Sequence, residues 1–105
     1  MAVTSKALFR GAATTTTTTV LYTVPASTTT VVTNIAVTNT GGSSYTFTLG
    51  MGPAAGQVSL HTTTTIAANT TVYIDCKQVL SATNTITGGA SNTAVNFHIS
   101  GVEIA

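Results

Sequence analysis

The chain has 105 residues and a net charge of +1, from three basic and two acidic side chains, and 43% of it is hydrophobic. This length suits one domain with a single core, this hydrophobicity excludes a disordered chain, and three cations are too few to bind a nucleic-acid backbone. The sequence has no apolar run of the roughly 18 residues that span a membrane, and residues 1–10 lack the apolar segment of a signal peptide.

Two short strands are predicted in the N-terminal part of the chain, at residues 7–11 and 17–24. The second stops at Pro25, which has no amide hydrogen to donate to a sheet. We expect residues 1–12 to form an N-terminal arm or first strand. Residues 13–105 are expected to form a single β-sandwich domain.

A longer strand is predicted from Val31, where apolar side chains occupy odd positions as far as Val37. Alternation with a period of two is typical of a half-buried strand, here with the odd positions facing inward. Residues 39–43 then supply the asparagine and glycine of a turn. Because residues 45–51 keep the same odd apolar phase, the two runs are predicted to pair as a hairpin.

The second half of the chain continues with shorter strands. Alternating apolar residues predict three of them, at 57–63, 71–75 and 83–87. Gly88 and Gly89 are expected to end the third strand. Residues 76–81 are the one candidate for a helical turn, because threonine and valine disfavour helix elsewhere.

The last strand changes phase near its end. Apolar side chains occupy odd positions from Val95 to Ile99, but Val102 and Ile104 lie on even positions. One additional residue inverts the phase of a strand, and glycine is favoured at such bulges. We therefore predict a β-bulge near Gly101, or an edge at which the strand changes partner.

Seven or eight short strands in one domain predict an all-β fold, an antiparallel β-sandwich or jelly roll. The 26 threonines fall largely on outward positions of these strands, where their hydroxyl groups face water. A surface with so little charge promotes association between copies. We therefore expect a homo-oligomer.

Catalysis is not expected, because the chain has too few acid–base groups. Asp75 and Glu103 are its only acidic side chains, and nothing in their spacing sets the separation that a catalytic carboxylate pair needs. Cys76 is interpreted as a small hydrophobic residue, with a disulfide between subunits as the alternative. We predict no enzyme activity and no cofactor.

A metal site is not expected either. His61 and His98 lie on separate predicted strands, whereas zinc sites normally have at least three protein ligands. His98 is more simply interpreted as a histidine that faces solvent or a neighbouring subunit. A site shared across a symmetry axis is the alternative that one chain's sequence leaves open.

Four segments of the chain resemble a known group of proteins. They are LYTVPA at 21–26, VTNT at 37–40, IAANTTV at 66–72 and HISGVE at 98–103. Together they resemble short virion structural proteins of tailed phages and prophages, of the head-decoration or minor tail type. The resemblance covers nearly the whole chain and implies a β-sandwich built into a virion. It carries over no catalytic residue.

The resemblance implies a non-enzymatic role in a phage particle assembled in the host cytoplasm. We predict a capsid decoration or cement protein whose partner is the major capsid protein. Lys6 and Arg10 lie within the first ten positions and are predicted to dock on an acidic capsid surface. The alternative is a minor tail or fibre protein with tail proteins as partners, which would stack a host glycan on Tyr22, Tyr45 or Tyr73.

Overall fold

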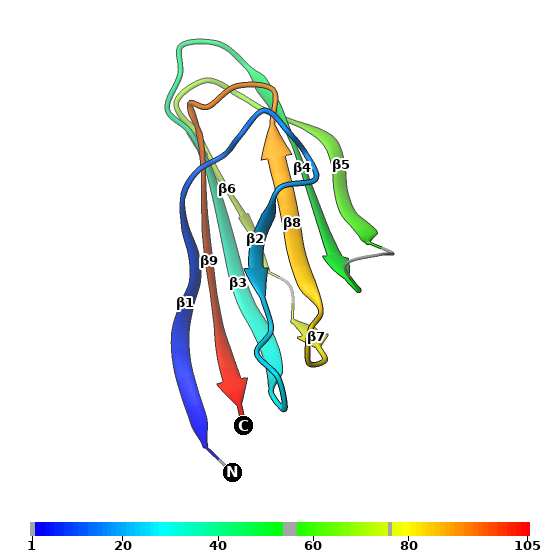
Figure 1. Ribbon diagram of the computed structural model, residues 1–105. Coiled ribbons are helices and arrows are strands. Elements are labelled where there is room, and N and C mark those ends of the chain that lie inside the picture. Colours follow the sequence, from blue (N-terminus) through cyan, green and yellow to red (C-terminus); the bar gives the residue numbers. More distant parts are fainter. Residues whose placement is uncertain (1, 54–56, 76) are drawn as a thin grey trace.

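The computed structural model describes residues 2–53, 57–75 and 77–105, and these fold into nine β-strands without a helix (Figure 1). The strands are β1 (Val3–Ala12), β2 (Val20–Thr23), β3 (Thr29–Asn39), β4 (Tyr45–Gly52), β5 (Val58–Ile66), β6 (Thr70–Ile74), β7 (Gln78–Leu80), β8 (Thr85–Ala90) and β9 (Val95–Ile104). The predicted all-β class is confirmed. No helix that could cross a membrane is found in the described part of the chain.

Two antiparallel sheets pack as a β-sandwich, which confirms the predicted architecture. Sheet I has the order β1-β9-β3-β6, with β7 paired to another stretch of β3, and sheet II has the order β2-β8-β4-β5. Strand β1 pairs with β9, β2 with β8, β3 with β6 and β4 with β5. The chain is therefore a long ribbon of paired strands wrapped over both sheets, as in a jelly roll.

The core lies between the inner faces of the two sheets. Phe47 of β4 and Phe97 of β9 meet edge to face across the sandwich, with ring centroids 6.2 Å apart, a favoured aromatic geometry. The odd positions of residues 45–51 and 95–99 face this core, so the inward phases predicted for these two strands are confirmed.

The segment between β6 and β8 differs from the sequence-based expectation. A helical turn was predicted at residues 76–81, but residues 78–80 form β7 and pair with β3. Val79 points outward and Leu80 is buried, which is the alternation of a strand. Cys76, the first residue of the predicted turn, lies outside the described residues.

The predicted hairpin of the third and fourth strands is wrong, because β3 belongs to sheet I and β4 to sheet II. The turn between them carries the chain from one sheet to the other. Buried Asn39 holds this crossing, since its amide nitrogen donates to the carbonyl oxygens of Ser43 (2.8 Å) and Ile66 (3.2 Å). Its side-chain oxygen accepts from the amide of Gly41 at 2.9 Å. The turn residues therefore mark a loop between sheets.

The inward phase of β3 is interrupted in the middle of the strand. Relative to β9, β3 has one additional residue at Thr33, so its side chains face the core at Val32 and next at Ile35. A bulge of this kind exchanges the two faces of a strand. Val31, predicted to face inward, consequently lies on the outer face of sheet I.

Gly101 lies in the middle of sheet I and not at an edge, because β9 pairs with β1 on one side and β3 on the other. The additional residues near it belong to the neighbouring strands, Leu8 in β1 and Thr33 in β3. A Cβ at Gly101 would lie 2.6 Å from the carbonyl oxygen of Val31 and 2.8 Å from Cδ1 of Leu8. Glycine is needed for this close approach, and β9 keeps its phase with Val102 outward.

Candidate functional site

The described part of the chain has no pocket, so its candidate sites are side-chain clusters and surfaces. The two predicted docking residues, Lys6 and Arg10, both lie on β1. Because β1 has an additional residue at Leu8 relative to β9, positions 6 and 10 do not share a face as they would in a regular strand. Lys6 turns towards sheet II, and Arg10 lies on the outer face of sheet I.

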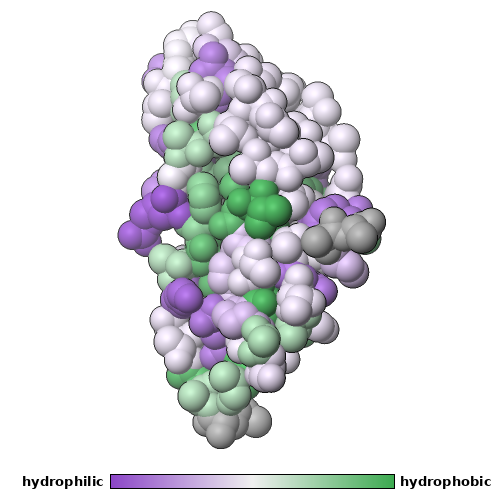
Figure 2. Space-filling view, viewed as in Figure 1, coloured by the Kyte–Doolittle hydropathy of each residue, from purple (hydrophilic) through white to green (hydrophobic). Residues whose placement is uncertain are grey.

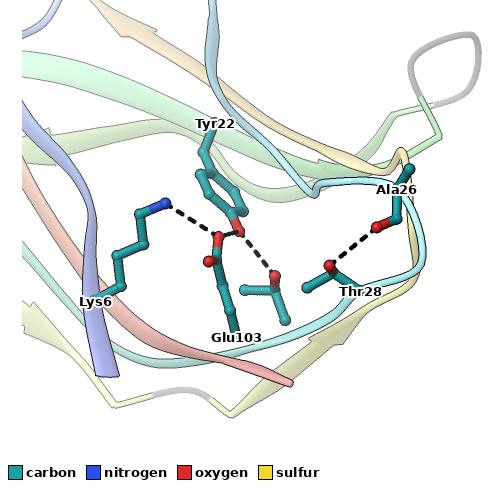
Figure 3. A network of polar contacts seen from close by, with 6 residues as sticks. Lys6, Tyr22, Ala26, Thr28 and Glu103 are labelled. Carbon is teal, nitrogen blue, oxygen red and sulfur yellow. Dashed lines mark hydrogen bonds and ion pairs between the residues drawn. The ribbon is translucent and has the colours of Figure 1, made fainter. Parts of the chain in front are cut away.

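Lys6 joins a cluster of polar side chains at the end of the sandwich where the two termini lie (Figures 1 and 3). We name Lys6, Tyr22, Thr30 and Glu103 the Glu103 cluster. Oε2 of Glu103 accepts from the Tyr22 hydroxyl at 2.5 Å and from Nζ of Lys6 at 3.4 Å. The Tyr22 oxygen in turn accepts from Oγ1 of Thr30 at 2.8 Å. The cluster therefore connects β2 of sheet II to β1, β3 and β9 of sheet I.

Two groups of the Glu103 cluster have shifted pKa values. Burial, followed by the hydrogen bond to Glu103, raises the pKa of Tyr22 from 10.0 to about 12. The hydrogen bond from Tyr22, assisted by Lys6 and opposed by burial, holds the pKa of Glu103 below its ordinary value of 4.5. Glu103 is therefore ionised at neutral pH, and its charge is met by two donors from different strands.

Arg10 lies in a row of side chains that crosses the outer face of sheet I. It pairs with His98 of β9, His98 pairs with Ala36 of β3, and Ala36 pairs with Tyr73 of β6. Arg10, His98 and Tyr73 are exposed, whereas Ala36 is small and half-buried. Arg10 makes no ion pair within the described ranges.

Apolar side chains continue this outer face towards the termini. Val102 pairs with Val31 and Val31 with Val79, so three valines form a row across β9, β3 and β7. Val3 and Ile104 pair in the next row. Of the five exposed large hydrophobic side chains in the described residues, three lie on this face, namely Val3 (65% exposed), Tyr73 (72%) and Val79 (68%).

The outer face of β8 in sheet II, by contrast, is covered by the chain itself. Gln57 lies across β8 and β4: its amide nitrogen donates to Oγ1 of Thr85 and to the carbonyl oxygen of Gly52, each at 2.7 Å. Its side-chain oxygen accepts from Oγ1 of Thr87 at 3.0 Å. Thr85 and Thr87 are consequently buried although they belong to the outer face.

The threonine run at residues 14–19 covers the other end of β8. The amides of Gly88 and Ala90 donate to carbonyl oxygens of this run, each at 2.9 Å. A Cβ at Gly89 would lie 2.3 Å from the carbonyl oxygen of Thr16, so the loop rests directly on glycine backbone. The predicted strand at 17–24 therefore begins only at Val20, and β8 continues through the glycines expected to end it.

The two histidines are not brought together. His61 belongs to sheet II, where its ring lies 5.5 Å from that of Phe47 and its Nδ1 lies 3.3 Å from Oγ1 of Thr64. His98 lies exposed on the outer face of sheet I. Among the described residues no group of three histidine, aspartate, glutamate or cysteine side chains is placed to hold a metal ion.

The two acidic side chains have different surroundings. Asp75 follows β6 and pairs with Lys77 at 3.2 Å, with both side chains well exposed. Glu103 is largely buried in its cluster. The three candidate tyrosines also differ: Tyr22 is buried, Tyr45 is half-buried and Tyr73 is exposed. Only Tyr73 is placed to stack on a glycan.

The Glu103 cluster was not predicted from the sequence. Tyr22, Thr30 and Glu103 are far apart in the chain, and their meeting depends on which strands pair across the sandwich. A signal did exist, because Glu103 occupies an odd position in a strand whose odd positions face inward. A carboxylate there needs buried donors to replace its hydration.

Comparisons with known proteins show the fold. No protein-family model and no curated protein matches this chain. Among solved structures, a chain of infectious bursal disease virus, Gx strain, is similar with a TM-score of 0.59 and 12% identity, covering 97% of this chain. A chain of the T13 particle of the same icosahedral virus is similar with a TM-score of 0.55 and 10% identity, covering 97%. This chain spans 30% of each.

Proposed function

We propose that this protein is a structural component of a virion, in the role of a capsid decoration or cement protein of a tailed phage. The observation that carries the proposal is the jelly roll, which follows the fold found in icosahedral virus particles over 97% of the chain. Jelly rolls are common in viral capsid domains, although a fold alone does not define a function. The phage-like segments favour the same role.

The test is the location and copy number of the protein in particles of the phage that encodes it. Quantitative mass spectrometry of purified particles, with immunogold labelling, supplies both. A decoration protein is expected on the head, in symmetry-related copies on the order of hundreds. Absence from purified particles would contradict the proposal of a virion protein altogether.

A minor tail or fibre protein is the second candidate. The exposed ring of Tyr73, beside the polar outer rows of sheet I, is the observation that favours a glycan-binding role. Such a protein would be found at the tail, in about a dozen copies or fewer. Glycan-array binding that Tyr73→Ala abolishes would support this candidate over capsid decoration.

Docking on an acidic capsid surface is proposed to use Arg10, because Lys6 is already held by Glu103. An Arg10→Glu variant should then occupy fewer sites on decoration-free particles than the wild type. Lys77→Glu is the matched control, since Lys77 is an exposed cation on another part of the protein. Equal occupancy by the Arg10 variant, the control and the wild type would remove Arg10 from the docking surface.

A further inference from the structure

We propose that the outer face of sheet I is a contact surface between two copies of this chain, related by a two-fold axis parallel to the strands. The inference follows from the character of the face and does not rest on a role in a virion. Arg10 and Tyr73 lie on this face, so a second copy would take the place of the capsid surface or glycan proposed for them. It also assigns a location to the self-association that the low charge of the sequence favours.

The face is large enough for a stable dimer and is apolar towards one end. Its three long strands, β1, β3 and β9, have 10, 11 and 10 residues, of which about half face outward. With the outward residues of β6 and β7, the face approaches the roughly 20 residues per partner of a standard interface. The valine row at Val31, Val79 and Val102 forms an apolar patch near the end of the face where the termini lie.

The face is also complementary to itself under the proposed symmetry. An axis between β9 and β3 lays β9 of one copy over β3 of the other. His98 of one copy then meets the small Ala36 of the second copy, and Val102 meets Val31. A large side chain thus opposes a small one, and the valines of β9 and β3 oppose each other. Val79 of one copy lies over Ser5 of β1 in the other. An axis perpendicular to the strands and through the middle of the sheet would instead lay the valine row over polar rows.

Charge does not oppose this arrangement. Figure 2 shows the side of the molecule on which β1 and β2 lie in front, and strongly hydrophilic patches are few and separate there. The cation of the outer face, Arg10, lies at the β1 rim, so the two-fold places it over the β6 rim of the second copy and beside its Tyr73. The two Arg10 side chains are thus at opposite rims, and each approaches an aromatic ring that attracts a cation.

The sheet edges are less suited to self-association than this face. Edge strand β1 carries a bulge at Leu8 and the charges of Lys6 and Arg10, which are features that hinder strand addition. Edge strand β5 has two shifts of register against β4. The remaining edge strands, β2, β6 and β7, have only 4, 5 and 3 residues. A second copy is therefore expected to pack on the face.

Sedimentation equilibrium over a concentration series tests the proposal with the full chain. The wild type should approach twice the 10.5 kDa chain mass. Val79→Lys and Tyr73→Lys should each raise the dissociation constant by about tenfold or more. Val58→Lys is the matched control, because Val58 is 69% exposed against 68% for Val79 but lies on β5 of sheet II. Its dissociation constant should equal that of the wild type.

Each outcome decides the proposal, because the substituted side chains are exposed and circular dichroism confirms that each variant is folded. A wild type that stays monomeric at every concentration overturns it. A dimer that Val58→Lys weakens as much as Val79→Lys also overturns it, since the contact would then lie elsewhere. Loss of the dimer in both sheet I variants, with the control unchanged, supports it.

Discussion

The outer faces of the two sheets are built from similar threonine-rich strands but are finished differently. On sheet II, Gln57 and the loop at residues 14–19 close over β8. On the outer face of sheet I, the side chains of Val3, Tyr73 and Val79 are exposed to solvent. The first face uses its polar groups within the fold, whereas the second leaves apolar side chains exposed, and we propose that a second copy packs there.

The glycines and threonines of β8 explain this difference. A covering segment can approach a sheet closely only where side chains are absent or small, as at Gly89 and Gly50. On sheet I the corresponding outward positions hold branched or aromatic side chains such as Val31 and Tyr73. Backbone cannot approach them closely, so they are better suited to packing against the side chains of a second surface.

The largest expected effect comes from blocking the cover of sheet II. Gly89→Ala places a methyl group 2.3 Å from the Thr16 carbonyl oxygen, so it should lower the free energy of unfolding by about 1–3 kcal/mol. Gly42→Ala is the control, because nothing lies within 4 Å of a Cβ there. Urea unfolding measures both. Equal stability of the two variants would mean that the loop does not rest on Gly89.

A smaller effect is expected at the Glu103 cluster, which connects the two sheets. Because the pKa of Glu103 is lowered in the folded state, its contribution is present above the ordinary value of 4.5 and is lost as pH falls through the folded-state pKa. Glu103→Gln should therefore cost about 1 kcal/mol at pH 7 and reduce the loss of stability in acid. Unfolding curves from pH 7 to pH 3 measure both effects.

Asp75→Asn is the control for this experiment, since Asp75 is an exposed carboxylate paired only with exposed Lys77. Its removal should leave the pH dependence of stability close to that of the wild type.

The stability of the fold at alkaline pH adds an independent check. The raised pKa of Tyr22 stabilises the fold below pH 10.0, and this contribution should disappear as pH rises through about 12. If Glu103→Gln changed neither the acid nor the alkaline part of the dependence of stability on pH, the cluster would not connect the sheets as described.

The smallest effect on stability is expected on the outer face of sheet I. Val79→Lys should change the free energy of unfolding of the monomer by about 0.5 kcal/mol or less, because Val79 is 68% exposed and packs little within its own chain. Thermal melts at a concentration below the dimer range measure this. A large loss of monomer stability would show that Val79 serves the fold, and the contrast with Gly89 would be lost.

Much of the fold follows from periodicity in the sequence. Alternating apolar residues located most of the strands, and the inward phase was correct in β4 and in β9 as far as Ile99. Periodicity failed at Val31, Val102 and Ile104, where apolar side chains face outward. In β3 a bulge exchanges the two faces of the strand, and in β9 apolar side chains simply face outward. From the sequence alone neither case can be distinguished from the other, because both appear as a shift of apolar residues between odd and even positions.

Tertiary pairing accounts for the other differences. The turn after Asn39 has the residues of a hairpin, but the chain crosses there to the second sheet. Lys6 was expected to be free for docking, yet the pairing of β1 with β9 places it beside Glu103. Threonines were expected on outward positions, but Thr30 is buried. Its hydroxyl group is the hydrogen-bond partner of the buried Tyr22 oxygen.

The difference between the two outer faces is tested most directly by nuclear magnetic resonance during dilution. Amide spectra of the wild type, recorded from high to low concentration, report which strands experience self-association. The account predicts concentration-dependent shifts in β1, β3, β6, β7 and β9, centred on Val31 and His98, with β4 and β8 unchanged. Shifts concentrated in β4 and β8, or none at any concentration, would contradict it.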